Sequence, residues 1–156
     1  MKSDADYLRL AMALAAESRA TGNHPFGALL VGPGGDVLLS SGNTYARDRG
    51  IGHAESNVVR AAALRYEPEF LEACTLFTSV EPCCMCSGAS YWAGIGTVVY
   101  GLSEKRLGEL TGDNPENLTI DLSCHQVFAA GRRDIAVRGP FPELEEDILK
   151  DHKDFW

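Results

Sequence analysis

The spacing of apolar residues predicts helices at both ends of the chain and between them. Residues 4–20 carry apolar side chains at helical spacing, with acids in the first turn and Gly22 after the end; both features favour a helix there. Residues 53–65 contain neither glycine nor proline and keep apolar side chains on one side. Residues 142–155 are charged but amphipathic. We expect helices over residues 4–20, 53–65, 83–93, 103–110 and 142–155.

Short apolar runs between these helices predict strands. The turn-forming sequence Gly-Pro-Gly-Gly-Asp at residues 32–36 joins the first two runs, which predicts a hairpin. Residues 43–52 are polar and predict a loop. Because helices and strands alternate after the hairpin, we expect an α/β fold with a helix-covered sheet whose second half is parallel. The expected strands cover residues 26–31, 37–39, 75–80, 97–100 and 134–137.

The size and composition of the chain fit a single domain over residues 1–156. Hydrophobic residues make up 45% and charged residues 23% of the sequence, which is typical of globular domains and unlike a disordered chain. No apolar run approaches the roughly 18 residues that a membrane span needs. The first six residues carry acids where a signal peptide carries cations. We therefore expect a cytoplasmic protein that does not enter a membrane.

The charge and the cysteines narrow the kinds of ligand. The formal net charge is −8 at pH 7, which argues against a protein that grips a nucleic-acid backbone, since that requires a basic surface. A small or neutral substrate fits better. Three of the five cysteines stand at positions 83, 84 and 86. Neighbours this close make a poor disulfide framework, so in a cytosolic chain they indicate metal binding or redox chemistry.

Two short motifs carry the candidate chemistry: His-Ala-Glu at residues 53–55 and Pro-Cys-Cys-Met-Cys at residues 82–86. Zn²⁺ prefers imidazole and thiolate ligands, and a catalytic zinc site leaves one of four positions open. Cys83 and Cys86 are three residues apart, so they share a face of a helix whose positive end favours ionised sulfur. His53 opens the preceding helix. We expect His53, Cys83 and Cys86 to hold one Zn²⁺.

Glu55 lies two residues after the predicted ligand His53, which places it beside the metal rather than on it. A carboxylate there can take a proton from water and hand it to a leaving nitrogen. Two alternatives remain. A closed structural zinc site would usually have a fourth Cys or His ligand, and a redox pair of cysteines would leave the His-Ala-Glu motif without a role.

Several stretches of the chain match a known family, and they cover residues 25–100 well and the rest loosely. They are Pro25-Phe26-Gly27-Ala28, Gly42-Asn43, His53-Ala54-Glu55, residues 78–86 and Gly88-Ala89-Ser90-Tyr91-Trp92-Ala93. The chain resembles the cytidine deaminase-like superfamily of zinc deaminases. Within it, the chain is most similar to the small bacterial guanine deaminases and next to the tRNA adenosine deaminases.

The resemblance implies a fold and an activity. The fold is a three-layer α-β-α sandwich with a mixed five-stranded sheet, and it carries one catalytic Zn²⁺ per chain. The activity is hydrolytic removal of an amine from a heterocyclic base. The resemblance also implies a homodimer in which a segment of the neighbour helps close the pocket.

The resemblance implies substrate contacts as well. Asn43 would hydrogen-bond the base, Ala54 would turn its backbone N–H toward it, and Phe26 would line the slot for the ring. Trp92 matches the guanine deaminases, in which Tyr-Trp-Ala follows the second ligand helix, and its plane suits a flat substrate. Each residue also has a purely structural alternative. Asn43 could simply form a turn, and Ala54 could simply begin a helix. Phe26 could be an ordinary strand residue, and Trp92 could pack in the core.

Two regions depart from the guanine deaminase pattern. Those enzymes carry an acid, beyond the strand after the metal helix, that recognises a purine N–H, and here either Asp113 or Asn114 stands there. A carboxylate only accepts hydrogen bonds whereas an amide also donates, so with Asn114 the preferred base could differ from guanine. The chain ends in Phe155 and Trp156. Related base deaminases use C-terminal residues as a lid, and we expect the same of these two.

The sequence thus predicts a zinc-dependent hydrolase that acts on the exocyclic amine of a free nucleobase, with guanine favoured. Alternatives within this chemistry are cytosine, a triazine or a nucleoside. A further alternative is tRNA adenosine, which the acidic charge disfavours. The alternative of another class is a non-catalytic zinc module that binds a partner protein.

Overall fold

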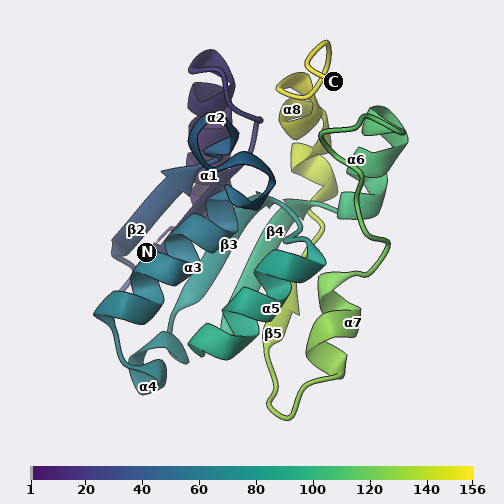
Figure 1. Ribbon diagram of the computed structural model, residues 1–156. Coiled ribbons are helices and arrows are strands. Elements are labelled where there is room, and N and C mark those ends of the chain that lie inside the picture. The colour runs from purple at the N-terminus through teal and green to yellow at the C-terminus, as the bar shows by residue number, and fades with distance from the viewer. Residues whose placement is uncertain (1) are drawn as a thin grey trace.

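The computed structural model describes residues 2–156 and is built on one five-stranded sheet (Figure 1). Its strands are β1 (Gly27–Val31), β2 (Val37–Gly42), β3 (Thr75–Val80), β4 (Thr97–Leu102) and β5 (Ala136–Arg138). They lie in the order β2-β1-β3-β4-β5. β1 is antiparallel to β2 and β3, whereas β3, β4 and β5 run parallel. The predicted mixed five-stranded sheet is therefore confirmed.

Three helices cover one face of the sheet (Figure 1). These are α3 (Ala54–Arg65), α5 (Cys84–Ala93) and α7 (Cys124–Ala129). They pack on side chains such as Leu30 and Leu76 in one buried apolar cluster. The parallel crossovers place α3 and α5 side by side, and α3 packs against α5.

The opposite face is covered by α1 (Asp4–Ala20) and α8 (Glu145–Lys150). Here Leu29 and Phe77, which alternate with the side chains of the first face, form a second cluster. The helix α6 (Glu104–Thr111) adds Leu107 to this cluster. Two covered faces make three layers, so the predicted α-β-α sandwich is confirmed.

Gly27 shows how closely α1 lies on the sheet. A Cβ atom at this position would stand 2.1 Å from the carbonyl oxygen of Ala11 and 2.7 Å from the Cβ atom of Leu14. Only glycine permits the helix backbone to come this near. The direction in which a side chain at residue 27 would point is therefore occupied by the backbone of α1.

The predicted elements are present, with differences where helices are short. α7, α2 (Tyr45–Asp48) and α4 (Pro68–Leu71) were not predicted, because one or two turns show too little periodicity to recognise. The expected helix over residues 142–155 is a 3-10 turn at Pro142–Leu144, then α8, then turns. The turns let Trp156 fold back and hydrogen-bond His152.

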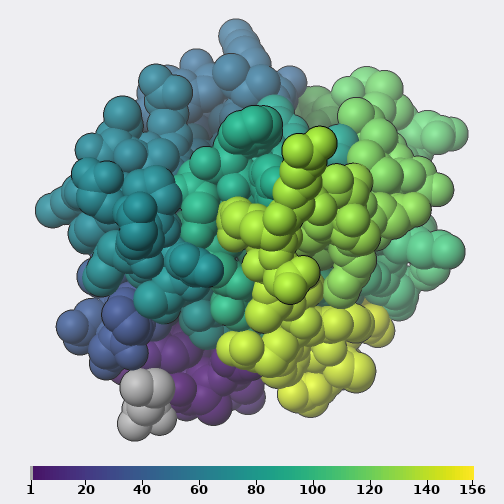
Figure 2. All heavy atoms as spheres, turned by 90° about the horizontal axis from the view of Figure 1, so that it is seen from below, coloured from purple at the N-terminus to yellow at the C-terminus, as the bar shows by residue number. Residues whose placement is uncertain are grey.

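The N-terminal segment contacts a part of the chain that is distant in sequence. In Figure 2 the N-terminal segment lies beside the segment that follows β5. An ion pair joins the start of α1 to the last residue of β5, with Arg138 Nε 2.6 Å from Asp4 Oδ2. None of the described helices has the length and apolar character needed to cross a membrane.

Candidate active site

The three predicted metal ligands converge at the N-termini of α3 and α5. His53 and Cys83 are the residues that immediately precede these helices, and Cys86 lies in the first turn of α5. His53 Nδ1 is 3.4 Å from Cys83 Sγ and 3.5 Å from Cys86 Sγ. With usual zinc–nitrogen and zinc–sulfur bonds, the N···S edge of a tetrahedron is about 3.5 Å. The donor set and its spacing therefore fit Zn²⁺.

Two features prepare the sulfurs to act as ligands. Hydrogen bonds from Cys86 and His53 lower the pKa of Cys83, which favours its thiolate, and the hydrogen bond to Cys83 together with burial raises the pKa of Cys86. The hydroxyl of Ser56, in the first turn of α3, lies 3.0 Å from Cys86 Sγ and holds that sulfur in place. The two sulfurs and the imidazole nitrogen of His53 are thus held close enough together to share one metal ion.

Glu55 is buried beside the three ligands, with 5% of its surface exposed. Burial raises its pKa to about 7. The hydroxyl of Thr78 lies 3.0 Å from Glu55 Oε1 and 2.8 Å from the carbonyl oxygen of Val80. This hydroxyl can donate to an ionised Glu55, or donate to Val80 and accept from a protonated Glu55. Both protonation states of Glu55 therefore have a partner.

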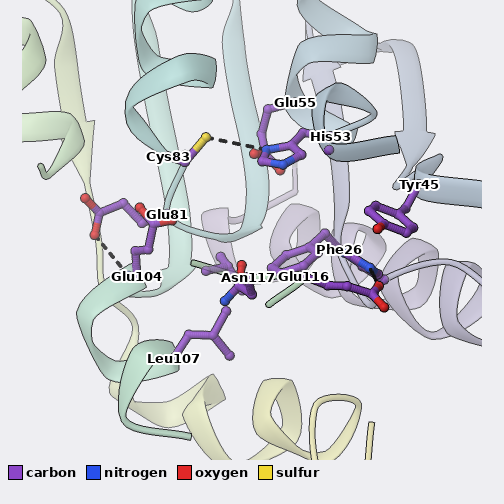
Figure 3. Close-up of a pocket in the computed structure, with 13 residues that line it drawn as sticks. Phe26, Tyr45, His53, Glu55, Glu81, Cys83, Glu104, Leu107, Glu116 and Asn117 are labelled. Atoms are coloured by element: carbon purple, nitrogen blue, oxygen red, sulfur yellow. Dashed lines mark hydrogen bonds and ion pairs between the residues drawn. The ribbon is translucent and has the colours of Figure 1, made fainter. Parts of the chain in front are cut away.

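A narrow cavity opens next to these groups (Figure 3). It leaves about 40 Å³ for the centres of water molecules, which is room for a few waters. None of the described residues that line it is lysine or arginine. They are His24, Phe26, Tyr45, Gly50, His53, Glu55, Val80, Glu81, Cys83, Glu104, Leu107, Glu116 and Asn117.

The sequence of this chain matches a known protein family. Residues 1–102 match the model of the cytidine and deoxycytidylate deaminase zinc-binding region. The chain belongs to this deaminase family. Zinc is accordingly its cofactor, and His53, Cys83 and Cys86 are positioned to hold it.

Relatives of the deaminase differ in substrate. A probable cytosine deaminase of Schizosaccharomyces pombe is 36% identical over 155 residues, which are 99% of this chain and 93% of that one. The guanine deaminase of Bacillus subtilis is 34% identical over 109 residues, 69% of this chain and 70% of that one. A structure from a study of A-to-I editing by tRNA:A34 deaminases has a TM-score of 0.72 at 25% identity, covering 94% of this chain and 99% of that one.

One wall of the deaminase cavity is aromatic. His24 stacks on Tyr45 with 4.2 Å between ring centroids, and Phe26 lies on the same side of the cavity (Figure 3). His24 Nε2 lies 2.7 Å from Glu116 Oε1. This contact ties the loop after α6 to the segment before β1 and narrows the cavity.

The C-terminal residues pack behind this aromatic wall. The Trp156 ring centroid is 4.9 Å from that of His24 and 6.1 Å from that of Phe26. Trp156 Nε1 donates to His152 Nδ1 at 3.1 Å, and Phe155 lies edge-on to His24 at 5.7 Å. Phe155 and Trp156 therefore support cavity residues without lining the cavity themselves, and their role as a lid stays a prediction.

Asn43 and Ala54 are both buried at the edge of the site. Asn43 Oδ1 accepts hydrogen bonds from the backbone N–H groups of His24 and Tyr45, at 3.3 and 2.8 Å. These bonds orient the amide and leave its Nδ2 group to donate. Ala54 is the first residue of α3. Neither residue lines the narrow cavity, so their predicted contacts with a base remain predictions.

The structure does not bring three predicted substrate contacts to the cavity. Trp92 lies near the far end of α5 and is 85% exposed, in a groove with Ile51 and Leu64. Asp113 is exposed in the turn after α6, and Asn114 accepts a hydrogen bond from the backbone N–H of Glu116 instead. The reason is local: the chain turns at Gly112, and residues 116 and 117 reach the cavity in their place.

Three acids in the cavity were not predicted as site residues. Glu81 accepts from the backbone N–H groups of Glu104 at 3.2 Å and Cys124 at 2.9 Å, and so caps the starts of both α6 and α7. Glu104 and Glu116 line the cavity from α6 and from the following loop. Glu81 stands directly before the Pro-Cys motif, which was a signal for it. Glu104 and Glu116 lie in charged stretches that resemble any solvated surface.

Proposed function

We propose that this protein is a zinc-dependent aminohydrolase that removes an exocyclic amine from a free nucleobase and releases ammonia. The observation that carries the proposal is Glu55, a buried carboxyl beside the His53, Cys83 and Cys86 ligand set at the wall of a cavity. In a closed zinc site that only stabilises the fold, a carboxyl group that faces a cavity would have no chemical role. A redox cysteine pair has no use for His53.

The chemistry follows from the position of Glu55. When bound by His53 and the two cysteines, Zn²⁺ supplies the Lewis acidity that makes water a nucleophile near neutral pH. Glu55 takes the proton of the attacking water on a carboxylate oxygen. It passes this proton to the ring nitrogen next to the amine-bearing carbon. It then takes the proton of the hydroxyl group that has been added to that carbon and gives it to the departing amine, which leaves as ammonia. Thr78 can hydrogen-bond Glu55 before and after each transfer.

The charge of the cavity favours a substrate without phosphate. Glu55, Glu81, Glu104 and Glu116 line it, and no described residue there is lysine or arginine. An anionic substrate would meet like charges. The net charge of −8 likewise disfavours a long nucleic-acid contact. A neutral free base therefore fits better than a nucleotide or a tRNA.

Cytosine and guanine are the two candidate bases. The sequence motifs favour guanine, and the similarity to the guanine deaminase of Bacillus subtilis, over 109 residues, supports it. The similarity to the probable cytosine deaminase of Schizosaccharomyces pombe spans 155 residues. It therefore includes the segment from Glu116 to the end of the chain, which lines the cavity and supports its wall. Because the similarity covers this segment, and because a narrow cavity suits the smaller base, we favour cytosine over guanine as the substrate.

The decisive experiment measures ammonia release by the zinc-loaded protein from a panel of cytosine, guanine, adenine, cytidine, guanosine, cytidine monophosphate and a tRNA anticodon-arm hairpin. We expect turnover of a free base, loss of turnover after zinc chelation, and recovery when zinc is restored. Release of ammonia from the hairpin or the nucleotide alone would overturn the free-base proposal. No ammonia from any compound, with one zinc per chain, would identify a non-catalytic module.

We further propose that two chains pair through an apolar groove beside the site. Its exposed side chains are Ile51, Leu64, Met85 and Trp92, of which Leu64 and Trp92 are 81% and 85% exposed. An exposed apolar patch on a small domain marks an interaction site. The groove lies along α3 and α5, whose N-termini carry the metal ligands, so a second copy there would stand next to the cavity.

A further inference from the structure

A serine hydroxyl on α3 contacts the sulfur of a metal ligand on α5. Ser56 Oγ, in the first turn of α3, lies 3.0 Å from Cys86 Sγ. A cysteine that ligates Zn²⁺ does so as a thiolate, so its sulfur carries no proton and can only accept hydrogen bonds. When the metal is bound, the hydroxyl of Ser56 is therefore the donor in this contact.

The hydroxyl of Ser56 makes this contact instead of a common local one. A serine inside a helix can turn its hydroxyl back to the carbonyl oxygen four residues earlier. Ser90 of α5 does so, and its Oγ donates to the carbonyl oxygen of Cys86 at 2.8 Å. Within residues 2–156, the only hydrogen-bond contact of the Ser56 hydroxyl is Cys86 Sγ. The side chain of Ser56 is thus committed to the sulfur.

The two ligand sulfurs differ in the kind of donor that holds them. Cys83 Sγ accepts from the backbone N–H of Cys86, and a backbone donor stays the same whatever residue types surround it. The donor to Cys86 Sγ is the side chain of residue 56. Position 56 is therefore a place where the sequence can adjust the metal centre without changing a ligand.

Ser56 acts from outside the cavity. It lines the apolar groove, together with Met85 and Trp92, and it is not among the residues that line the cavity beside Glu55. A substrate in the cavity would not touch it. Any effect of Ser56 on the reaction must therefore pass through Cys86.

A hydrogen bond to a ligand sulfur has two physical consequences. It fixes the direction in which the sulfur presents its lone pairs, so less orientational freedom is lost when the metal binds. It also draws electron density from the sulfur, which then gives less to the metal and leaves it a stronger Lewis acid. Groups in such supporting positions typically change metal affinity or activity by about 10- to 100-fold when they are removed.

We propose that Ser56 is a positioning residue whose hydroxyl donates to the ligand sulfur of Cys86 and thereby sets the affinity and the Lewis acidity of the zinc. The effect on the metal follows from the ligand set alone. The effect on turnover rests on the proposed function, because a more electrophilic zinc makes water a better nucleophile.

The test compares the wild type with Ser56→Ala, Ser56→Thr and Ser56→Val. Zinc affinity is measured by competition with a chromophoric chelator, and the thiolate-to-metal charge-transfer absorption is recorded on the cobalt(II)-loaded chain. We expect Ser56→Ala and Ser56→Val to bind zinc at least about 10-fold more weakly. Their charge-transfer band should move to longer wavelength, because a sulfur without the hydrogen bond gives up electron density more easily. Ser56→Thr keeps a hydroxyl and should stay within about 3-fold of the wild type.

Threonine and valine have nearly the same shape, so their comparison isolates the hydroxyl even if the alanine variant is unstable. Ser90→Ala is the matched control, since it removes a hydroxyl that bonds to the same cysteine at its carbonyl oxygen. This control should keep the cobalt spectrum and the zinc affinity of the wild type.

Turnover of the best base by the zinc-loaded variants completes the test. We expect kcat to fall about 10-fold in Ser56→Val and to recover in Ser56→Thr, with little change in KM, because Ser56 does not contact the substrate. Equal cobalt spectra and zinc affinities in Ser56→Thr and Ser56→Val would overturn the role of Ser56, as would a change in Ser90→Ala as large as that in Ser56→Ala. If the wild type released ammonia from no base, the proposed function would fail, while the cobalt spectra would still decide the role of Ser56.

Discussion

Glu55 is held on one side only, by the hydroxyl of Thr78, while the rest of its carboxyl faces the metal ligands and the cavity. Burial raises the pKa of this carboxyl to about 7. The neighbouring residues Cys86 and Asn43 are held differently, by fixed polar partners. At the scale of the residue, therefore, the site combines a carboxyl group that has one side-chain partner with neighbours that are held by other polar groups.

Replacement of Glu55 by glutamine keeps the shape of the side chain and removes the proton acceptor. We expect Glu55→Gln to retain one zinc per chain and to lose turnover by about 10³-fold, a typical contribution of general acid–base catalysis. Steady-state kinetics and metal analysis of the same preparation check this. The exposed Glu69, replaced in the same way, is the control. A Glu55→Gln rate near that of the wild type would remove Glu55 from the mechanism.

His152 makes stability depend on pH. Burial, helped by the charge of Arg19, lowers the pKa of His152 from 6.5 to about 4. Between these values the unfolded chain binds a proton that the folded chain does not, so this contribution to stability is present above about pH 6.5 and is lost as the pH falls toward 4. The loss is at most about 3 kcal/mol.

The measurement is the free energy of unfolding between pH 7 and pH 4, for the wild type and for His152→Gln. We expect the wild type to lose more stability than the variant over this interval, because glutamine does not titrate. The exposed His125, replaced by glutamine, should follow the wild type. Parallel curves for the wild type and His152→Gln would contradict the expected dependence.

Helix starts organise the site at the scale of the element. The starts of α3 and α5 present the ligands, and Glu81 caps the starts of α6 and α7. The positive ends of these helices favour thiolate and carboxylate groups. At the other edge, Arg19 on α1 donates from Nη1 to the carbonyl oxygens of Asp151 and Lys153, at 2.7 and 2.8 Å, and ties down the C-terminal segment.

Deletion of residues 153–156 tests whether that segment acts as a lid. The deletion removes Trp156 from His24 and Phe26, so the aromatic wall loses its support while the metal ligands are untouched. We expect kcat/KM for the best base to fall at least about 10-fold, as a misplaced substrate-positioning group costs that much or more, with zinc content unchanged. Lys153→Ala, which keeps the backbone, is the control. Unchanged kinetics after the deletion would contradict the hypothesis that the C-terminal segment acts as a lid.

The apolar groove beside α3 and α5 is a feature of the whole molecule, since its residues come from three segments of the chain. An aspartate at Trp92 would place a charge in the centre of a proposed interface and would disturb no core, because Trp92 is 85% exposed. We expect the wild type to be a dimer and Trp92→Asp to be a monomer at micromolar concentration. Light scattering coupled to gel filtration measures both.

The control for the interface is Leu10→Asp, which adds the same charge at an exposed apolar residue on α1, on the opposite face of the sheet. This variant should behave as the wild type does. A monomeric wild type, or a Trp92→Asp variant that remains a dimer, would place the contact elsewhere or remove it.

The sequence by itself determined the layers of the fold, the metal ligands and Glu55. Periodicity specifies which side chains face the core, and the resemblance implied the three layers. Each motif lies at the start of one helix, so its own geometry is local, whereas the meeting of His53 with Cys83 and Cys86 requires α3 to pack against α5. Only the tertiary structure decided which acids and aromatic residues surround the cavity. Glu104, Glu116 and Tyr45 come from separate segments, as does Trp156 behind them. Their meeting depends on how loops fold over the sheet, which leaves no pattern in neighbouring residues.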